Sequence, residues 1–151
     1  PAPVTVDLIF FDLEDLGNID DLPFAIGADQ FVKKNSFYKP DKGIIVDMVC
    51  DKNLVIPKEL FSKKYSRALQ NEIWAVAKTL GATVFSDENG THIIDDHLPL
   101  IEVGMNVVNL IHYPFPSYWH TTYDTPKNCS VDSLSQVGNV ILTLIYNQDN
   151  T

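Results

Sequence analysis

The sequence predicts an α/β fold in which a layered, mostly parallel or mixed sheet is flanked by helices. Short apolar runs with the length of buried strands alternate along the chain with segments whose apolar residues recur at helical spacing. Acidic residues also follow or interrupt these runs, and α/β proteins place their chemistry on loops at strand ends. No repeat, low-complexity tract or linker divides the chain, so residues 1–151 are expected to form a single domain.

Three apolar runs are expected to be strands: residues 4–11, 43–49 and 107–111. The first is almost wholly apolar and ends in a cluster of acids, and the second is interrupted by Asp47. A near-continuous apolar run is typical of a strand buried on both faces, in a sheet covered by helices. The first two runs are therefore expected to lie inside the sheet.

Helices are expected at residues 21–34, 65–80 and 98–103, and in a terminal segment marked by Leu134, Val137, Ile141 and Ile145. The second of these is followed by Gly81 and the third by Gly104, and glycine is a common helix stop. The least regular stretches are residues 16–20, 85–91 and 113–130. These stretches are expected to be the loops that carry the chemistry.

The net charge limits the class of partner. The chain has 11 basic and 20 acidic residues, which gives a formal charge of −9. Nucleic acid and anionic membrane surfaces are bound through clustered lysine and arginine, so both are disfavoured as partners. No apolar run approaches the roughly 18–20 residues of a membrane helix. The expected partner is neutral or cationic, such as a peptide with a free amino terminus.

The chain contains two cysteines, Cys50 and Cys129. Two cysteines are too few for a disulfide framework, although they allow one bridge. Two unpaired thiols are the simpler interpretation and are what we expect.

Carboxylates lie at two of the expected strands. The acids of residues 12–15 directly follow the first strand, where they form either a solvated turn or a site. Adjacent carboxylates repel, so a nearby cation would relieve them. Asp47 lies inside the second strand, and a buried carboxylate is unfavourable unless it is paired or bound to metal. For Asp47, a structural hydrogen bond to a loop and a functional role are both open.

A second acidic pair, Asp95 and Asp96, precedes Leu98 and Pro99. This pattern is typical of a helix N-terminus, where an acid caps backbone amides and proline occupies an early position. At least one of the two aspartates is expected to be such a cap.

Residues 113–122 form a loop that two prolines stiffen and that carries aromatic residues and His120. Neutral imidazole is the commonest metal ligand, and it needs rigid support. His92, His97 and His112 have no comparable setting and are expected to be structural or solvent-facing. Several acids and one histidine on separate strand-end loops are the donor set that suits zinc.

Three motifs in order resemble the zinc aminopeptidase superfamily, which includes secreted bacterial dizinc aminopeptidases and the glutaminyl cyclases. They are VDLIFFDLED at residues 6–15, DDHLP at residues 95–99 and PFPSYWHT at residues 114–121. The interval from Asp95 to His120, 120 − 95 = 25 residues, looks like the cyclase branch. The resemblance extends from Val6 to Tyr146.

The resemblance implies a zinc enzyme with one or two ions. It implies that Asp15 and His120 are metal ligands, and that Asp47 binds a second metal or joins a hydrogen-bond network. By the same resemblance Glu14 is the general acid/base and Asp95 is an acid of the substrate pocket. Trp119 and Phe115 would then form the aromatic wall of that pocket.

Two features depart from the family pattern. Leu13 occupies a position where relatives commonly have glycine. The family also has a His-x-Asp pair before the first motif, whose aspartate binds zinc, and this chain has no His-x-Asp. A catalytic zinc normally has three protein ligands. We therefore expect N-terminal strands and at least one ligand to come from a missing N-terminal segment or a complementary chain.

Three functions follow from these expectations. The leading one is glutaminyl-peptide cyclisation, which converts an N-terminal glutamine to pyroglutamate and ammonia. The alternative is hydrolytic removal of N-terminal residues by a zinc metallo-aminopeptidase. A further alternative is an inactive interaction domain of the same fold. The resemblance also implies a secreted or periplasmic location.

Overall fold

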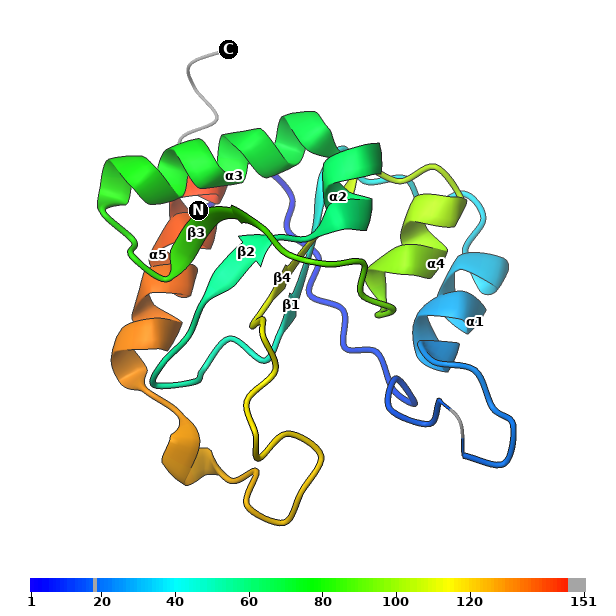
Figure 1. Ribbon diagram of the computed structural model, residues 1–151. Helices are drawn as coiled ribbons and strands as arrows, with labels where there is room; N and C mark the ends of the chain where they lie inside the picture. Colours follow the sequence, from blue (N-terminus) through cyan, green and yellow to red (C-terminus); the bar gives the residue numbers. More distant parts are fainter. Residues whose placement is uncertain (18, 147–151) are drawn as a thin grey trace.

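The computed structural model describes residues 1–17 and 19–146 (Figure 1). In chain order its elements are α1 (Ile26–Lys34), β1 (Gly43–Asp47), β2 (Ile56–Lys58), α2 (Leu60–Tyr65), α3 (Arg67–Leu80), β3 (Phe85–Asn89), α4 (His97–Glu102), β4 (Val107–Ile111), the 3-10 helix η1 (Pro126–Asn128) and α5 (Val131–Tyr146). Parallel strands are flanked by helices, so the predicted α/β fold is confirmed.

Two parallel strand pairs form the centre of the molecule. β1 pairs with β4, from Gly43 opposite Val107 to Asp47 opposite Ile111, and β2 pairs with β3. Every residue of β4 is buried. Because β1 and β4 run in the same direction, Asp47 and Ile111 meet at one edge of the sheet. The loops that leave these two strand ends therefore start side by side, as expected for an α/β site.

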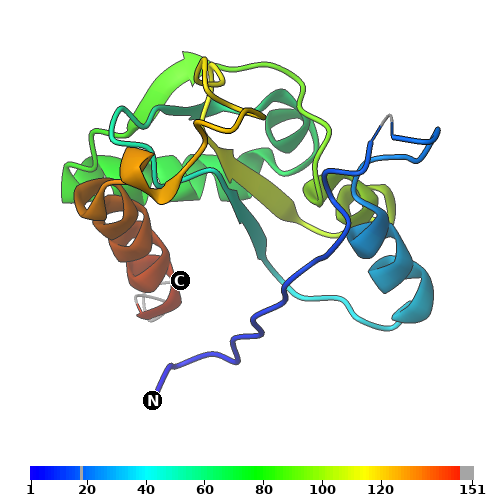
Figure 2. The same ribbon diagram turned by 90° about the horizontal axis from the view of Figure 1, so that it is seen from below.

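An apolar core lies on each face of the β1–β4 pair. Val108 and Leu110 pack with α3 and α5 in the larger core, whereas Val107 packs with α1 and α4 in the smaller one. This division follows from the alternation of side chains along a strand. Figure 2 shows α3 and α5 on one side of the strands and α1 and α4 on the other.

The expectation of a buried strand at residues 4–11 is wrong for the described chain. The segment is extended but belongs to neither sheet (Figure 2). Leu8 is 81% exposed and Phe10 is 91% exposed. Only Phe11 packs against a core, where its ring lies edge-on to Phe31 at 5.5 Å. An apolar run shows that a segment suits burial, but burial itself requires neighbouring strands and covering helices.

The helix expected at residues 21–34 begins later, at Ile26. Asp21 and Ala25 have left-handed φ angles of 59° and 56°, which no α-helix can accommodate. Pro23 lies between them and has no N–H for a helix hydrogen bond. Among residues 1–17 and 19–146, no helix is both long enough and apolar enough to cross a membrane.

The other helices and strands largely follow the predictions. Gly81 and Gly104 end α3 and α4 with φ angles of 66° and 83°, as expected for glycine stops. Four elements were not predicted: β2, α2, β3 and η1. β2 is only three residues long and contains Pro57, so it leaves little periodic signal. Residues 85–91 were expected to be irregular, but β3 forms most of this stretch.

The expectation of two unpaired thiols is wrong, because Cys50 and Cys129 form a disulfide. The Ser130 N–H donates to the Cys50 carbonyl at 2.6 Å, and the Lys52 N–H donates to the Asn128 carbonyl at 2.9 Å. These contacts connect the segment after β1 to the end of the loop at residues 113–130. The two cysteines are 79 residues apart, so only the tertiary fold reveals their proximity.

Glu59 is a buried carboxylate, 1% exposed, that joins three segments. It accepts hydrogen bonds from the N–H groups of Phe61 at 2.8 Å and Ser62 at 2.6 Å, which begin α2. It also accepts from the N–H of Ile93 at 3.3 Å, and His97 Nε2 lies 3.3 Å from its Oε2. Burial would raise the pKa of Glu59, but the contacts with His97, Ser62 and Phe61 outweigh it and lower the pKa to about 2.

Glu59→Gln should lower the free energy of unfolding at neutral pH by about 2–4 kcal/mol, because the buried N–H groups lose a charged acceptor. The folded-state pKa of about 2 lies below the ordinary value of 4.5. The carboxylate therefore stabilises the fold fully above about pH 4.5, and the effect is lost as pH falls toward 2. Urea unfolding across this range should show the two proteins converging in acid. Glu88→Gln, at an exposed position, is the matched control, and a pH-independent difference would contradict the assignment.

Candidate active site

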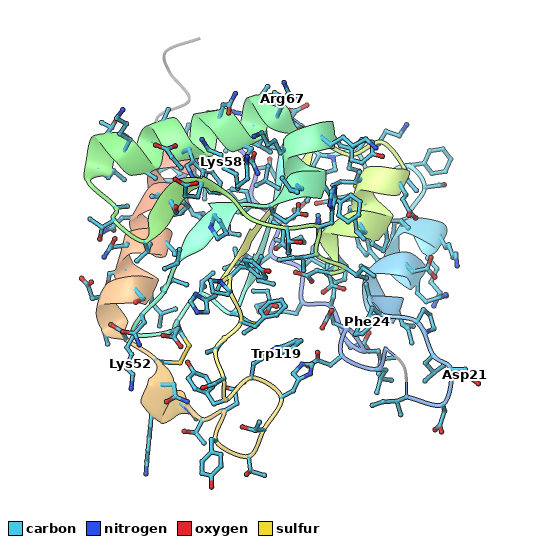
Figure 3. The ribbon with its side chains drawn as sticks, in the orientation of Figure 1. Asp21, Phe24, Lys52, Lys58, Arg67 and Trp119 are labelled. Carbon is cyan, nitrogen blue, oxygen red and sulfur yellow. A yellow bond between two sulfur atoms is a disulfide. The ribbon has the colours of Figure 1, made fainter. Side chains whose placement is uncertain are left out.

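A cavity of about 240 Å³ opens at the edge of the sheet where β1 and β4 end. Five segments line it: the acidic loop with Glu14, Asp15 and Phe24, the end of β1 with Asp47 and Met48, residues 91–95, the end of β4 with Ile111, and the aromatic loop with Phe115, Trp119 and His120. Figure 3 shows Phe24 and Trp119 on two loops at the same end of the molecule. All seven residues proposed from the sequence line this one cavity: Glu14, Asp15, Asp47, Asp95, Phe115, Trp119 and His120.

The aromatic loop holds His120 through consecutive turns. The Trp119 N–H donates to the Pro116 carbonyl at 2.9 Å, and the Thr121 N–H donates to the Tyr118 carbonyl at 3.1 Å. His120 itself has a left-handed φ of 58°. These turns direct the imidazole across the cavity toward the acidic loop.

His120 and Asp15 meet across the cavity, with Nε2 of the histidine 3.2 Å from Oδ1 of the aspartate. An imidazole nitrogen beside a carboxylate oxygen is a donor pair that suits zinc. Within the described residues, no three histidine, cysteine or acidic side chains are arranged to hold a metal ion. A catalytic zinc normally has three protein ligands. The donor types of His120 and Asp15 therefore fit zinc, but these two side chains alone are fewer than the three ligands of a usual catalytic site.

Glu14 is a half-buried carboxyl group surrounded by other acids. Burial, a hydrogen bond with Asp15, and the negative charges of Asp95, Asp15 and Asp47 raise the pKa of Glu14 to about 8. A carboxyl group with a pKa near neutrality both accepts and returns protons efficiently. Its surroundings are therefore suited to the acid/base role implied for this residue.

Asp47 ends β1 and faces the same acids. Burial and the charge of Asp95 raise its pKa to about 6, although a hydrogen bond from the Met48 backbone N–H partly opposes this. Met48 has a left-handed φ of 52°, so the chain turns sharply just after Asp47. Asp47 thus has a backbone hydrogen bond and also lies within the electrostatic reach of His120.

Asp95 is buried and lines the cavity, and the expectation that Asp95 or Asp96 caps a helix is wrong. α4 begins at His97, and the residue at its cap position, Asp96, makes no side-chain capping hydrogen bond. Asp95 instead accepts a hydrogen bond at Oδ2 from Asn109 Nδ2 at 2.6 Å. The Asp96 N–H donates to the other oxygen of Asp95 at 2.5 Å. Both carboxylate oxygens are thus fixed by neighbours.

Asn109 is a site residue that the sequence analysis missed. It is fully buried in the middle of β4, and its N–H donates to Ser62 Oγ at 3.0 Å. Its side-chain amide donates to Asp95, which lines the cavity. A lone amide inside the apolar run of residues 107–111 is the signal that could have identified it, because a buried polar side chain requires a partner.

Asn109→Ala should lower the free energy of unfolding by about 1–3 kcal/mol, because the buried carboxylate of Asp95 loses a hydrogen bond. Urea unfolding measures this difference. Asn106→Ala, at an exposed position just before β4, is the matched control. An unchanged free energy of unfolding in the Asn109 variant would show that Asp95 does not depend on this contact.

Three rings form a continuous stack along the aromatic wall. The rings of Phe115 and Trp119 are stacked with centroids 4.3 Å apart, and those of Trp119 and His120 are 3.8 Å apart. The stack therefore connects the cavity wall directly to the imidazole that faces Asp15. Such contacts limit the rotation of His120 and so support its geometry.

The remaining histidines are structural or solvent-facing, as expected. His97 is buried beside Glu59, and His112 is buried with Nδ1 accepting from the Val55 N–H at 2.9 Å. His92 is exposed and packs edge-on against Phe61 at 4.6 Å. It also lines the cavity, which the sequence analysis did not anticipate.

The sequence model of peptidase family M28 matches residues 1–145 of the chain. Among curated proteins, glutaminyl-peptide cyclotransferase of Bos taurus is 39% identical over 51 residues, which are 32% of this chain and 14% of that protein. The glutaminyl-peptide cyclotransferase-like protein of Mus musculus is 43% identical over 51 residues, 32% of this chain and 13% of its own length.

Solved structures give longer matches. Porphyromonas gingivalis glutaminyl cyclase superposes with a TM-score of 0.87 at 31% identity, over 92% of this chain and 54% of its own. A Zn-dependent exopeptidase from Parabacteroides distasonis superposes with a TM-score of 0.84 at 31% identity, over 92% of this chain and 53% of its own. A leucine aminopeptidase precursor from Bacteroides thetaiotaomicron superposes with a TM-score of 0.83 at 29% identity, over 93% of this chain and 52% of its own. The chain thus spans about half the length of these solved proteins.

Proposed function

Because this chain belongs to peptidase family M28, we propose that it carries the active site of a zinc-dependent enzyme acting on peptide N-termini, with glutaminyl-peptide cyclisation as the leading reaction. One observation carries the proposal: acids from three separate segments and His120 converge on one cavity beside an aromatic wall. The similarity to glutaminyl cyclases over nine-tenths of the chain supports the same reading.

In the proposed reaction, the α-amine nitrogen of an N-terminal glutamine attacks the carbon of its side-chain amide. A ring C–N bond forms, the bond to the amide nitrogen breaks, and ammonia leaves. Glu14 accepts the proton from the amine and returns it to the departing nitrogen. Zinc held by Asp15 and His120, with a further ligand, would polarise the side-chain carbonyl as a Lewis acid.

The other cavity residues orient the substrate. Asp95, fixed by Asn109, would hold the amino group through a charge-assisted hydrogen bond. Phe115 and Trp119 form an apolar wall that excludes water, which would otherwise hydrolyse the amide. The acidic surroundings favour a free amino terminus, in agreement with the net charge of −9.

The alternative is hydrolysis of the first peptide bond by a zinc metallo-aminopeptidase. It is supported by the similarity to a Zn-dependent exopeptidase and to a leucine aminopeptidase precursor. In this reaction Glu14 would take a proton from water, and Asp47 would hold a second zinc ion. Both reactions use the same cavity and differ in the metal count and in the product.

The proposal also covers the source of the further zinc ligand and the compartment in which the protein acts. An N-terminal segment or a complementary chain would supply the further zinc ligand, since the chain spans about half of its solved relatives. The Cys50–Cys129 disulfide supports a secreted or periplasmic location, because such bonds persist in oxidising compartments.

The test is product analysis with the full-length protein and a peptide that begins with glutamine. Cyclisation releases ammonia and leaves a blocked peptide of unchanged length, which mass spectrometry identifies. Release of free glutamine instead would establish the aminopeptidase reaction. If the zinc-loaded full-length protein formed neither product, the hypothesis of an inactive interaction domain would be favoured.

A further inference from the structure

The aromatic loop, residues 113–130, is anchored to the rest of the chain at its two ends. At its start the Tyr113 N–H donates to the Val55 carbonyl at 3.0 Å. Between the two ends, the hydrogen bonds of the loop within the described chain connect residues of the loop to one another. Apart from the contact of His120 with Asp15, the position of the loop therefore depends on its anchors.

The anchor at the far end of the loop is the disulfide between Cys50 and Cys129. Cys50 closely follows Asp47, which ends β1. Cys129 lies in the same loop as His120, between that histidine and α5. The bond therefore joins the strand end that carries Asp47 to the loop that carries His120, and Figure 3 shows it in yellow near Lys52.

Two backbone hydrogen bonds accompany the disulfide at this end. The Ser130 N–H donates to the Cys50 carbonyl at 2.6 Å, and the Lys52 N–H donates to the Asn128 carbonyl at 2.9 Å. All residues between His120 and Asn128 are exposed. Hydrogen bonds in such a region open locally, because water can replace them. The disulfide limits this opening, since a covalent link removes conformations that the free loop could adopt.

We propose that Cys50 and Cys129 form a redox latch for His120: the disulfide holds the aromatic loop in the geometry of the site, and the reduced pair releases it. Cys129 is exposed, which gives a thiol access to the bond, whereas Cys50 is half-buried. The released loop brings His120 to Asp15 less often, and a metal-binding imidazole needs rigid support. The site is therefore fully assembled only under oxidising conditions.

The reductant is a dithiol, either a protein or a small molecule, and the reaction is thiol–disulfide exchange. A thiolate of the dithiol attacks Sγ of Cys129, the S–S bond breaks, and Cys50 leaves as a thiolate that takes up a proton. The second thiol of the reductant then attacks the mixed disulfide. This step releases the Cys129 thiol and leaves the reductant oxidised to a disulfide. Two electrons pass to the cysteine pair, and an oxidised dithiol reverses the same steps.

The first test is hydrogen exchange of the full-length protein, measured by mass spectrometry before and after reduction with a dithiol. Amide exchange in residues 114–128 should become at least about tenfold faster after reduction, because the loop loses its covalent anchor. Exchange in α3 should stay the same, since α3 packs in the larger core. Equal exchange of the loop in both states, or an equal acceleration in α3, would overturn the proposal.

The second test measures zinc affinity by competition with a chromophoric chelator. The double variant Cys50→Ser/Cys129→Ser represents the released loop without a thiol reagent, which would itself bind zinc. It should bind zinc about tenfold more weakly than the oxidised wild type, because His120 is held less rigidly. Ile73→Val, in the larger core and outside the cavity lining, is the control for a general loss of stability and should keep the wild-type affinity. An unchanged affinity in the double variant would overturn the latch.

Only the consequence for zinc rests on the proposed function. Zinc binding without turnover in the wild type would refute the proposed reaction and leave the latch standing, whereas a wild type that binds no zinc would overturn both. Reoxidation of the reduced wild type with an oxidised dithiol should restore slow exchange in the loop, and the same treatment should not change the double variant. Failure of the wild type to recover would contradict a reversible latch.

Discussion

Glu14→Gln should lower kcat by about 10²–10⁴-fold, while KM changes little. The glutamine side chain keeps the size and polarity of glutamate, but it cannot accept a proton from the substrate amine. The variant should be as stable as the wild type or more so, since burial and the charges of Asp95, Asp15 and Asp47 disfavour the Glu14 carboxylate. A rise in stability with a loss of activity is the opposite of what a structural residue gives.

Steady-state kinetics and thermal unfolding of the full-length protein test this prediction. Glu102→Gln, an exposed position at the end of α4, is the matched control and should alter neither measurement. A kcat within tenfold of the wild type would exclude Glu14 as the proton-transfer group.

His120→Ala should weaken zinc binding by at least about a hundredfold and abolish turnover. Its Nε2 lies 3.2 Å from Asp15 Oδ1, and these two side chains are the proposed ligands within the described chain. The variant also removes one ring from the stack on Trp119. The loss of zinc should therefore be accompanied by greater mobility of the aromatic loop.

Competition with a chromophoric chelator measures the zinc affinity of the variant in the full-length protein. His92→Ala is the matched control, because His92 lines the same cavity but packs against Phe61. The control should keep the wild-type zinc affinity. Equal affinities for wild type and His120→Ala would remove His120 from the metal site.

Much of the candidate site was predictable, because strand ends carry a local signal. Asp47 interrupts an apolar run, and the parallel pairing of β1 with β4 brings it to the edge where Ile111 ends. The proline-stiffened loop that leads to His120 follows β4, as expected for a strand-end loop, whereas the acids after residue 11 follow an apolar run that is not a strand among the described residues. The structure adds that these segments converge on one cavity.

The parts that the sequence did not reveal depend on long-range packing. The apolar run at residues 4–11 is suited to a strand, yet no described strand pairs with it. The pairing of Cys50 with Cys129 requires two loops to meet, and sequence spacing carries no such information. Phe24 was missed because it follows left-handed residues in an irregular segment, where a single aromatic has no pattern. Asn109 was missed because one amide hardly disturbs an apolar strand pattern.

A zinc-dependent site for peptide N-termini in this cavity requires metal for turnover. The decisive measurement is turnover of a glutamine-initiated peptide by the full-length protein, first after removal of metal with a chelator and then after addition of zinc. We expect no turnover without metal, and ammonia release that returns with zinc in the wild type but not in His120→Ala. Full turnover by the metal-free protein, or a zinc response that is unchanged in His120→Ala, would contradict it.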